Sequence, residues 1–208
     1  MIHPQQKPII YLITDGEANS GNFKEKKSEI LQRLRAASEA GVSHIQLREK
    51  FLTARSLFEL AEEAAEITRH FGTKLLVNGR ADIALAAGAD GVHLPADGLA
   101  VEVVRGSFPP NFVIAVSTHS PEEAVAAKTN GANFVTFGPV FESPGKGEPQ
   151  GVEALNRVCR LLDPFPVVAL GGIDESNYKN VVQNGASGFA AIRFFHNYRA
   201  VKDLFTNL

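Results

Sequence analysis

The chain has 208 residues, of which 44% are hydrophobic and 21% charged, and its formal net charge is −2 at pH 7. A chain of this length can bury a hydrophobic core that is stable without disulfides or structural metals. The lone cysteine, Cys159, excludes an internal disulfide framework. The nearly balanced charge gives no electrostatic reason to bind nucleic acid or an anionic membrane, and no apolar run reaches the roughly 20 residues of a membrane helix. We therefore expect a cytoplasmic α/β enzyme, in which residues 1–8 form a disordered N-terminal extension without the apolar stretch of a signal peptide.

Short, continuous apolar runs predict parallel strands that are covered on both faces. In chain order they include residues 9–14, 44–50, 74–78, 112–116, 166–170 and 188–193, with two more runs that end near residues 94 and 137. Between them, apolar residues recur at helical spacing. Ser120, Pro121 and Glu123 form a clear helix start, because they supply an N-cap, a first-turn proline and a capping-box glutamate.

Four glycines mark a repeat: Gly41, Gly88, Gly131 and Gly185 each follow an amphipathic stretch and precede an apolar run. This pattern predicts a helix that ends in a left-handed glycine, followed by a strand. The glycines are about 50 residues apart, which is room for two βα units in each interval. The chain is thus predicted to be one (β/α)8 TIM barrel domain over residues 1–208. An open doubly wound sheet is the alternative, weakened because no dinucleotide-binding fingerprint follows the first strand.

Candidate site residues lie where the strands end, since the active site of this barrel is at the carboxyl ends of its strands. In the second strand, alternation places Gln46, Arg48 and Lys50 on one face, and two cations there suggest an anionic ligand. The alternative is that this face is a solvated, salt-bridged edge. Asn78 ends the third strand and could donate to a ligand, or it is a turn residue before Gly79.

After the fifth strand, His119 stands at the expected catalytic rim, with Ser117 two residues before it. A histidine with an ordinary pKa of about 6.5 suits proton transfer near neutral pH. The alternative is a rim histidine that caps backbone groups. The following loop, residues 138–151, is rich in glycine and proline and is expected to be a mobile lid, in which Ser143 and Lys146 could close over an anion. It could equally be an ordinary solvated loop.

The loops after the seventh and eighth strands form the recurring phosphate site of this fold. Gly172, Ile192 and Arg193 are the candidate phosphate-binding residues, because glycines leave backbone N–H groups accessible and Arg193 adds a charge. Alternatively, the glycines serve only a tight turn. Arg193 itself either strengthens the phosphate site or blocks it.

With these residues, the chain resembles the thiamin phosphate synthase/thiazole tautomerase family over nearly its whole length. The motifs that carry the resemblance are at residues 11–15, 46–50, 78–80, 89–94, 116–120, 138–141 and 171–173. The resemblance implies a (β/α)8 barrel that handles a phosphorylated thiazole. It also implies one of two activities: a synthase that joins hydroxymethylpyrimidine diphosphate to the thiazole phosphate with Mg²⁺, or a tautomerase that aromatises a carboxythiazole phosphate.

Several positions favour the tautomerase, whose pattern has Asn-Gly-Arg after the third strand, Phe-Glu in the loop after the sixth strand and a catalytic histidine that matches His119. The synthase pattern has Asn-Asp after the third strand, whereas this chain has Asn78-Gly79, and Gly98 stands at the position of the second carboxylate, with Asp97 as the one substitute. Mg²⁺ binds through carboxylates and substrate phosphates, so we expect no metal and no cofactor. In this interpretation His119 moves the proton, and Arg48 or Lys50 holds the substrate carboxylate.

Three alternatives stay open. A thiamin phosphate synthase would use Mg²⁺ and Asp97, and a non-catalytic protein would only bind thiazole or thiamin phosphates. A sugar-phosphate isomerase leaves the motif at residues 46–50 unexplained. The expected partner is a small phosphorylated thiazole, with no nucleic acid and no membrane, and a homodimer is a further hypothesis.

Overall fold

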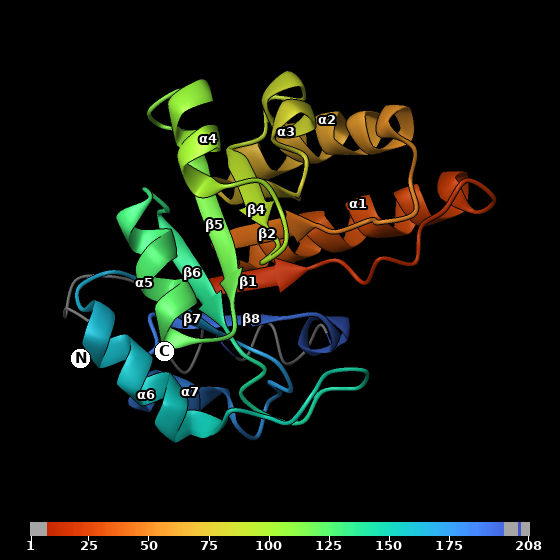
Figure 1. Ribbon diagram of the computed structural model, residues 1–208. Helices are drawn as coiled ribbons and strands as arrows, with labels where there is room; N and C mark the ends of the chain where they lie inside the picture. Colours follow the sequence, from red (N-terminus) through yellow and green to blue (C-terminus); the bar gives the residue numbers. More distant parts are fainter. Residues whose placement is uncertain (1–7, 198–203, 205–208) are drawn as a thin grey trace. The chain divides into compact units, whose positions relative to one another are not determined.

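The strand order is that of a closed barrel, β1-β2-β3-β4-β5-β6-β7-β8, with helices between the strands (Figure 1). The structure is a computed structural model that describes residues 8–197 and Leu204. Every strand pair with a defined register is parallel. The predicted (β/α)8 fold is confirmed, whereas the predicted N-terminal extension lies, apart from Pro8, outside the described residues.

The strands are short, and their apolar side chains are almost all buried. They are β1 (Ile9–Ile13), β2 (His44–Leu47), β3 (Lys74–Asn78), β4 (Gly91–Leu94), β5 (Val113–Thr118), β6 (Phe134–Phe137), β7 (Val167–Leu170) and β8 (Gly188–Ala191). The helices are α1 (Phe23–Ala40), α2 (Ala54–Phe71), α3 (Ala81–Ala86), α4 (Val101–Ser107), α5 (Pro121–Thr129), α6 (Gly151–Leu162), α7 (Tyr178–Gln183) and the 3₁₀ helix η1 (Arg193–His196). Within the described residues, no helix is long and apolar enough to cross a membrane.

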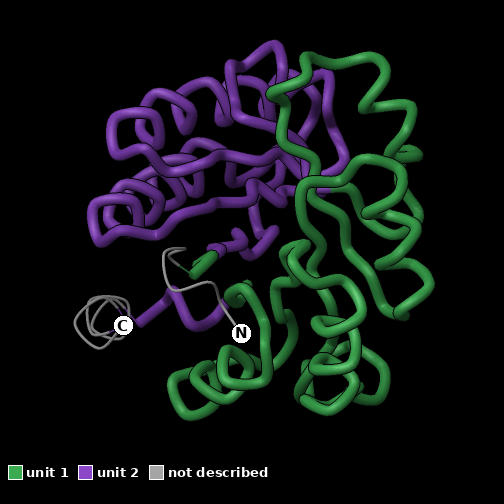
Figure 2. Tube along the Cα trace, turned by 90° about the vertical axis from the view of Figure 1, so that its left-hand side faces the viewer, with its two compact units in different colours: residues 1–10, 94–191 green, residues 11–93, 192–208 purple. Residues whose placement is uncertain are grey.

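The described residues fall into two compact units (Figure 2). Unit 1 comprises residues 8–10 and 94–191 and holds β5 to β8 with α4 to α7. Unit 2 comprises residues 11–93, 192–197 and Leu204, and holds β2, β3, most of β1 and β4, helices α1 to α3, and η1. Each unit has its own buried core.

The glycine repeat has the predicted conformation at all four positions. Gly41 ends α1 with φ 103° and donates its N–H to the last turn, and Gly88, Gly131 and Gly185 have φ values of 69°, 99° and 96°. The predicted helix start at α5 is also present, since the Ser120 hydroxyl accepts the Glu123 amide at 3.2 Å. Local sequence therefore defines where these helices begin and end.

β2 and β8 end two or three residues earlier than predicted, and the site residues beyond them therefore lie outside the strands. β2 ends at Leu47, so Lys50 is exposed and does not share a strand face with Gln46. β8 ends at Ala191, and Ile192 and Arg193 lead into η1. The reason is local: Phe194 and Phe195 are both 5% exposed, and a turn can bury two successive side chains where a strand would point them to opposite faces.

Candidate functional site

Unit 2 contains a buried polar network below the ends of β1, β2 and β4. The Tyr11 hydroxyl lies 3.0 Å from His93 Nδ1 and accepts a hydrogen bond from Gln46 Nε2 at 3.3 Å. Burial lowers the pKa of His93 to about 3, with the Arg48 charge as a second cause, and burial raises the pKa of Tyr11 above its ordinary value. The three side chains are therefore uncharged at neutral pH. Gln46 was predicted as a site residue, whereas Tyr11 was missed; its signal was a hydroxyl within an apolar strand.

The cations after β2 are placed differently from one another. Arg48 is half-buried, and its amide donates to Thr14 Oγ1 at 2.8 Å. A side chain at Gly16 would approach Arg48 Nη1 to 3.4 Å, so the guanidinium lies beside the loop that follows β1. Lys50 is exposed. Neither Arg48 nor Lys50 forms an ion pair with another described residue.

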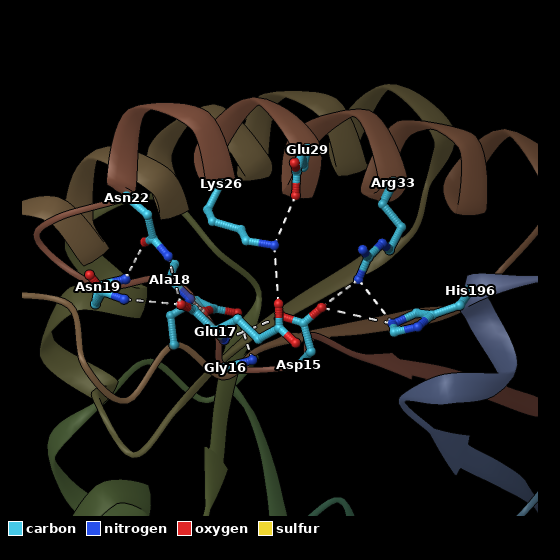
Figure 3. A network of polar contacts seen from close by, with 11 residues as sticks. Asp15, Gly16, Glu17, Ala18, Asn19, Asn22, Lys26, Glu29, Arg33 and His196 are labelled. Atoms are coloured by element: carbon cyan, nitrogen blue, oxygen red, sulfur yellow. Dashed lines mark hydrogen bonds and ion pairs between the residues drawn. The ribbon is translucent and has the colours of Figure 1, made fainter.

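The carboxylates that follow β1 and β2 are engaged by protein groups. Glu49, 4% exposed, accepts the amides of Ala18 at 3.0 Å and Gly16 at 3.3 Å, and burial raises its pKa. Asp15 accepts Arg33 Nη1 at 2.8 Å and lies 3.8 Å from His196 Nε2 (Figure 3). Burial, the largest single cause, raises the pKa of Asp15, but the hydrogen bonds from Arg33 and the Glu17 amide, together with the charges of Arg33 and His196, hold this pKa below its usual value.

After β3, Asn78 is half-buried, and Gly79 takes a left-handed conformation with φ 66°. The Gly79 amide donates to the His93 carbonyl at 2.8 Å. Arg80 then forms a two-bond ion pair with Asp82, at 2.8 and 2.6 Å. In the described part of the chain, no group of three or more His, Cys, Asp or Glu side chains is arranged to hold a metal ion.

In unit 1, His119 is fixed by three backbone contacts. Its Nδ1 lies 2.6 Å from the Gly138 carbonyl, which can only accept, so Nδ1 carries a proton, and in the neutral tautomer that this contact selects Nε2 keeps its lone pair. The His119 amide donates to Glu123 Oε2 at 2.6 Å, and Gln150 Nε2 donates to the His119 carbonyl at 2.6 Å. Sequence reasoning missed Gln150, which is far along the chain and carries no motif.

The start of the loop after β6 packs tightly on the end of β7. The amides of Val140 and Phe141 donate to the carbonyls of Leu170 and Gly171. A Cβ atom at Gly171 would lie 2.5 Å from Pro139 Cα, and one at Gly172 would lie 2.4 Å from the Glu142 carbonyl. These glycines are therefore required by close backbone packing, which supports the tight-turn alternative.

The other predicted site residues of unit 1 lie at its surface. Ser143 donates to the Phe141 carbonyl at 3.3 Å, Lys146 is exposed, and Ser117 is half-buried on β5. Asp97 is exposed in a turn in which the Gly98 amide donates to the Pro95 carbonyl. In unit 2, Ile192 is half-buried and Arg193 exposed. The roles of Gly172, Ile192 and Arg193 in phosphate binding stay predictions.

Comparison with known proteins identifies the family. The family described as "Thiamine monophosphate synthase" matches residues 10–195. A Geobacter sulfurreducens protein named "Putative thiamine-phosphate synthase" is 44% identical over 88% of this chain and 84% of its own length. A Caldanaerobacter subterraneus protein named "Thiamine-phosphate synthase" is 36% identical over 88% of this chain and 84% of its own length. The solved structure of the thiamine phosphate pyrophosphorylase from Pyrococcus furiosus has a TM-score of 0.81 and 30% identity, covering 94% of this chain and 93% of that one.

These relatives overturn the leading interpretation of the sequence. The prediction of a thiazole tautomerase, an isomerase, is wrong, because the relatives at 36% and 44% identity carry synthase names and the structural neighbour is a pyrophosphorylase. That prediction depended chiefly on residues in loops, above all Gly79 and Gly98 at the positions of the synthase carboxylates, and loops vary more readily than the elements they connect. The chain belongs to the thiamine monophosphate synthase family.

Proposed function

We propose that this protein is a thiamine-phosphate synthase, which joins hydroxymethylpyrimidine diphosphate to a thiazole phosphate. The observation that carries the proposal is the similarity to synthase-named relatives along almost the whole chain. In the reaction, the lone pair of the thiazole ring nitrogen forms a bond to the methylene carbon of the pyrimidine. The bond from that carbon to the diphosphate oxygen breaks, and pyrophosphate leaves with the electron pair.

The residues of unit 2 suit the diphosphate substrate. The network of Tyr11, Gln46 and His93 is buried and uncharged, which matches a neutral heteroaromatic ring that has its own donors and acceptors. Arg48 and Lys50 form no ion pair with the described residues and are assigned to the diphosphate, with Asn78 as a hydrogen-bond donor beside them.

The residues of unit 1 are assigned to the thiazole phosphate. Gly172, Ser143 and Lys146 would contact its phosphate. For Ile192 and Arg193, which belong to unit 2, phosphate binding stays a prediction from the sequence. Ser117 and His119 would hydrogen-bond the substrate. The coupling reaction transfers no proton to or from carbon, so His119 Nε2 acts here as a hydrogen-bonding group and not as a proton carrier.

The test is whether the protein forms thiamin phosphate from the two substrates, with the product measured by mass spectrometry. Product is expected only when both substrates and the protein are present. Gln46→Leu is expected to lower kcat/KM for the diphosphate substrate about tenfold, because the ring loses one hydrogen-bonding partner. Gln32→Leu, at an exposed position on α1, is the matched control. If no product forms at saturating substrate, with or without Mg²⁺, the proposed function is wrong.

The expected homodimer and the cytoplasmic location stay predictions. Light scattering of the purified protein would measure the mass of the particle directly.

A further inference from the structure

We propose that the described residues of this chain do not form a Mg²⁺ site on protein carboxylates, so that the cations already assigned to the diphosphate, Arg48 and Lys50, balance its charge instead. The inference rests on the proposed function and concerns which groups neutralise the negative charge of the diphosphate. Family resemblance implies a Mg²⁺ site with one carboxylate after β3 and a second after β4. The donor groups of this chain do not fit such a site, for three separate reasons.

The first reason is the backbone after β3. The position expected to carry the metal-binding aspartate is Gly79, which has no side chain. Its φ of 66° is left-handed, and its amide is used by the His93 carbonyl at 2.8 Å. The next residue, Arg80, brings a positive charge, so this turn offers no carboxylate oxygen to a cation.

The second reason is that the nearby carboxylates of unit 2 already have partners. Asp15 pairs with Arg33 at 2.8 Å (Figure 3), and Asp82 pairs with Arg80 at 2.6 Å. Glu49 is buried and accepts two backbone amides of the loop after β1. A Mg²⁺ ion would have to displace an ion pair or open that loop, and it is a cation that demands near-ideal octahedral oxygen geometry.

The third reason lies in unit 1, at the turn after β4. Gly98 stands at the position of the second carboxylate, and a Cβ atom there would lie 2.9 Å from Pro95 Cδ and 3.0 Å from the Pro95 carbonyl. The turn is therefore shaped for glycine, and a carboxylate at position 98 would require the backbone to shift. The neighbouring Asp97 is exposed, and it belongs to no group of three or more His, Cys, Asp or Glu side chains in the described residues that could hold a metal ion.

In contrast to these engaged carboxylates, the cations after β2 have no carboxylate partner within the described part of the chain. Arg48 and Lys50 form no ion pair with the described residues. Arg48 is half-buried beside Gly16, and its charge is the second cause of the low pKa of His93, after burial, so the guanidinium lies near the network that we assign to the pyrimidine ring. A guanidinium can bind phosphate oxygens with two parallel hydrogen bonds, which supplies charge and orientation together.

Binding of inorganic pyrophosphate, measured by calorimetry in EDTA and in excess Mg²⁺, tests this inference without catalysis. The wild-type protein is expected to bind in EDTA, with a Kd no weaker than in Mg²⁺. Arg48→Gln should weaken binding about tenfold or more in both buffers, because a charge-assisted contact is lost. The matched control is Lys74→Gln, which removes a cation that already pairs with Asp90, and it should change Kd by less than about twofold. Binding that requires Mg²⁺ would overturn the inference, and so would an Arg48→Gln variant that folds and binds normally.

A gain-of-function pair sharpens the test. Gly79→Asp and Gly79→Asn both place a residue that tolerates the left-handed conformation, but only aspartate adds a charge. We expect Gly79→Asp to acquire Mg²⁺-dependent pyrophosphate binding and Gly79→Asn not to. Equal behaviour of the two variants would overturn the assignment of position 79 as the missing ligand.

Failure of this inference can be told apart from failure of the proposed function. If thiamin phosphate forms but pyrophosphate binding requires Mg²⁺, only the inference is wrong. If pyrophosphate binds without Mg²⁺ but no thiamin phosphate forms, the inference about the anion site holds and the synthase assignment is wrong.

Discussion

The polar groups of unit 2 and those of unit 1 are held in place by different means. In unit 2, Tyr11, Gln46 and His93 are buried, and burial itself keeps His93 neutral. In unit 1, His119 is an exposed residue whose tautomer is set by the carbonyl of Gly138, while Gln150 and Glu123 hold its backbone. The first arrangement depends on side-chain desolvation, and the second depends on the backbone path of a glycine-rich loop. We therefore expect the arrangement in unit 2 to respond mainly to pH and to loss of a buried polar partner, and the arrangement in unit 1 to respond mainly to changes in the backbone.

The largest effect is expected from the backbone of unit 1. Gly171→Ala would place a methyl group 2.5 Å from Pro139 Cα at φ 100° and should lower the free energy of unfolding by about 3 kcal/mol or more. Gly145→Ala is the control, because Gly145 also has a positive φ but no atom lies within 4 Å of its added Cβ. It should cost only about 1 kcal/mol. Urea denaturation measures both, and equal losses would contradict the role of close packing.

The second effect is a pH dependence that arises in unit 2. The folded-state pKa values of His93 and His44 are lowered by burial to about 3 and about 4, so the unfolded chain takes up protons that the folded chain does not. The free energy of unfolding should therefore be undiminished above pH 6.5 and fall as the pH drops from 6.5 toward 4. The slope is about 1.4 kcal/mol per pH unit for each such group.

His93→Gln separates the two histidines in this titration. The variant should lose the His93 share of the slope between pH 6.5 and 4 while keeping the share of His44. Urea denaturation across this range measures the slope, and a slope identical to that of the wild type would show that His93 is not the neutral buried group.

A smaller effect is expected at the hydroxyl of the same network. Tyr11→Phe keeps the ring but leaves His93 Nδ1 and Gln46 Nε2 without the oxygen that both contact. A buried polar group that loses its partner costs about 1–3 kcal/mol. Chemical denaturation at pH 7 measures the loss, and the double variant Tyr11→Phe, His93→Gln should lose less than the sum of the two single variants. Simple additivity would mean that the two side chains are not coupled.

The smallest effect is expected from loss of the hydrogen bond between the Gln150 side chain and the His119 carbonyl. Gln150→Ala removes a hydrogen bond at a partly exposed position and should cost about 1 kcal/mol or less. Its clearer consequence is a mixture of His119 tautomers, because the Gly138 carbonyl is no longer held by the Gln150 amide. Nitrogen NMR of labelled histidine reports the tautomer ratio. An unchanged ratio would show that Gly138 is held by the loop alone.

Several features of the fold could be predicted because they depend on neighbours in the chain. The glycine that ends α1 and the serine that starts α5 act on amides within one helical turn, so their positions are readable locally. The apolar runs mark the strands, and β3 has its predicted bounds. The ends of β2 and β8 were predicted too late, because the chain turns there in response to Thr14, Asn19 and two buried phenylalanines.

The candidate site was predicted in its residue types but not in its contacts. Gln46, Arg48 and His119 were identified from their place after strands, while Tyr11 and Gln150 were not, since their partners lie 82, 35 and 31 residues away along the chain. The missing aspartate at position 79 was visible in the sequence, but the tautomerase activity predicted from it is wrong.

The sequence by itself determined the eight-unit repeat, the parallel barrel and the cluster of candidate residues after its strands, because periodicity and glycine conformation are local properties. Only the tertiary structure decided which charges are engaged and which are not. Asp15, Glu49 and Asp82 are bound by protein groups, whereas Arg48 and Lys50 have no ionic partner in the described residues. The physical reason is that an electrostatic interaction depends on distance and burial, and the folded chain sets both.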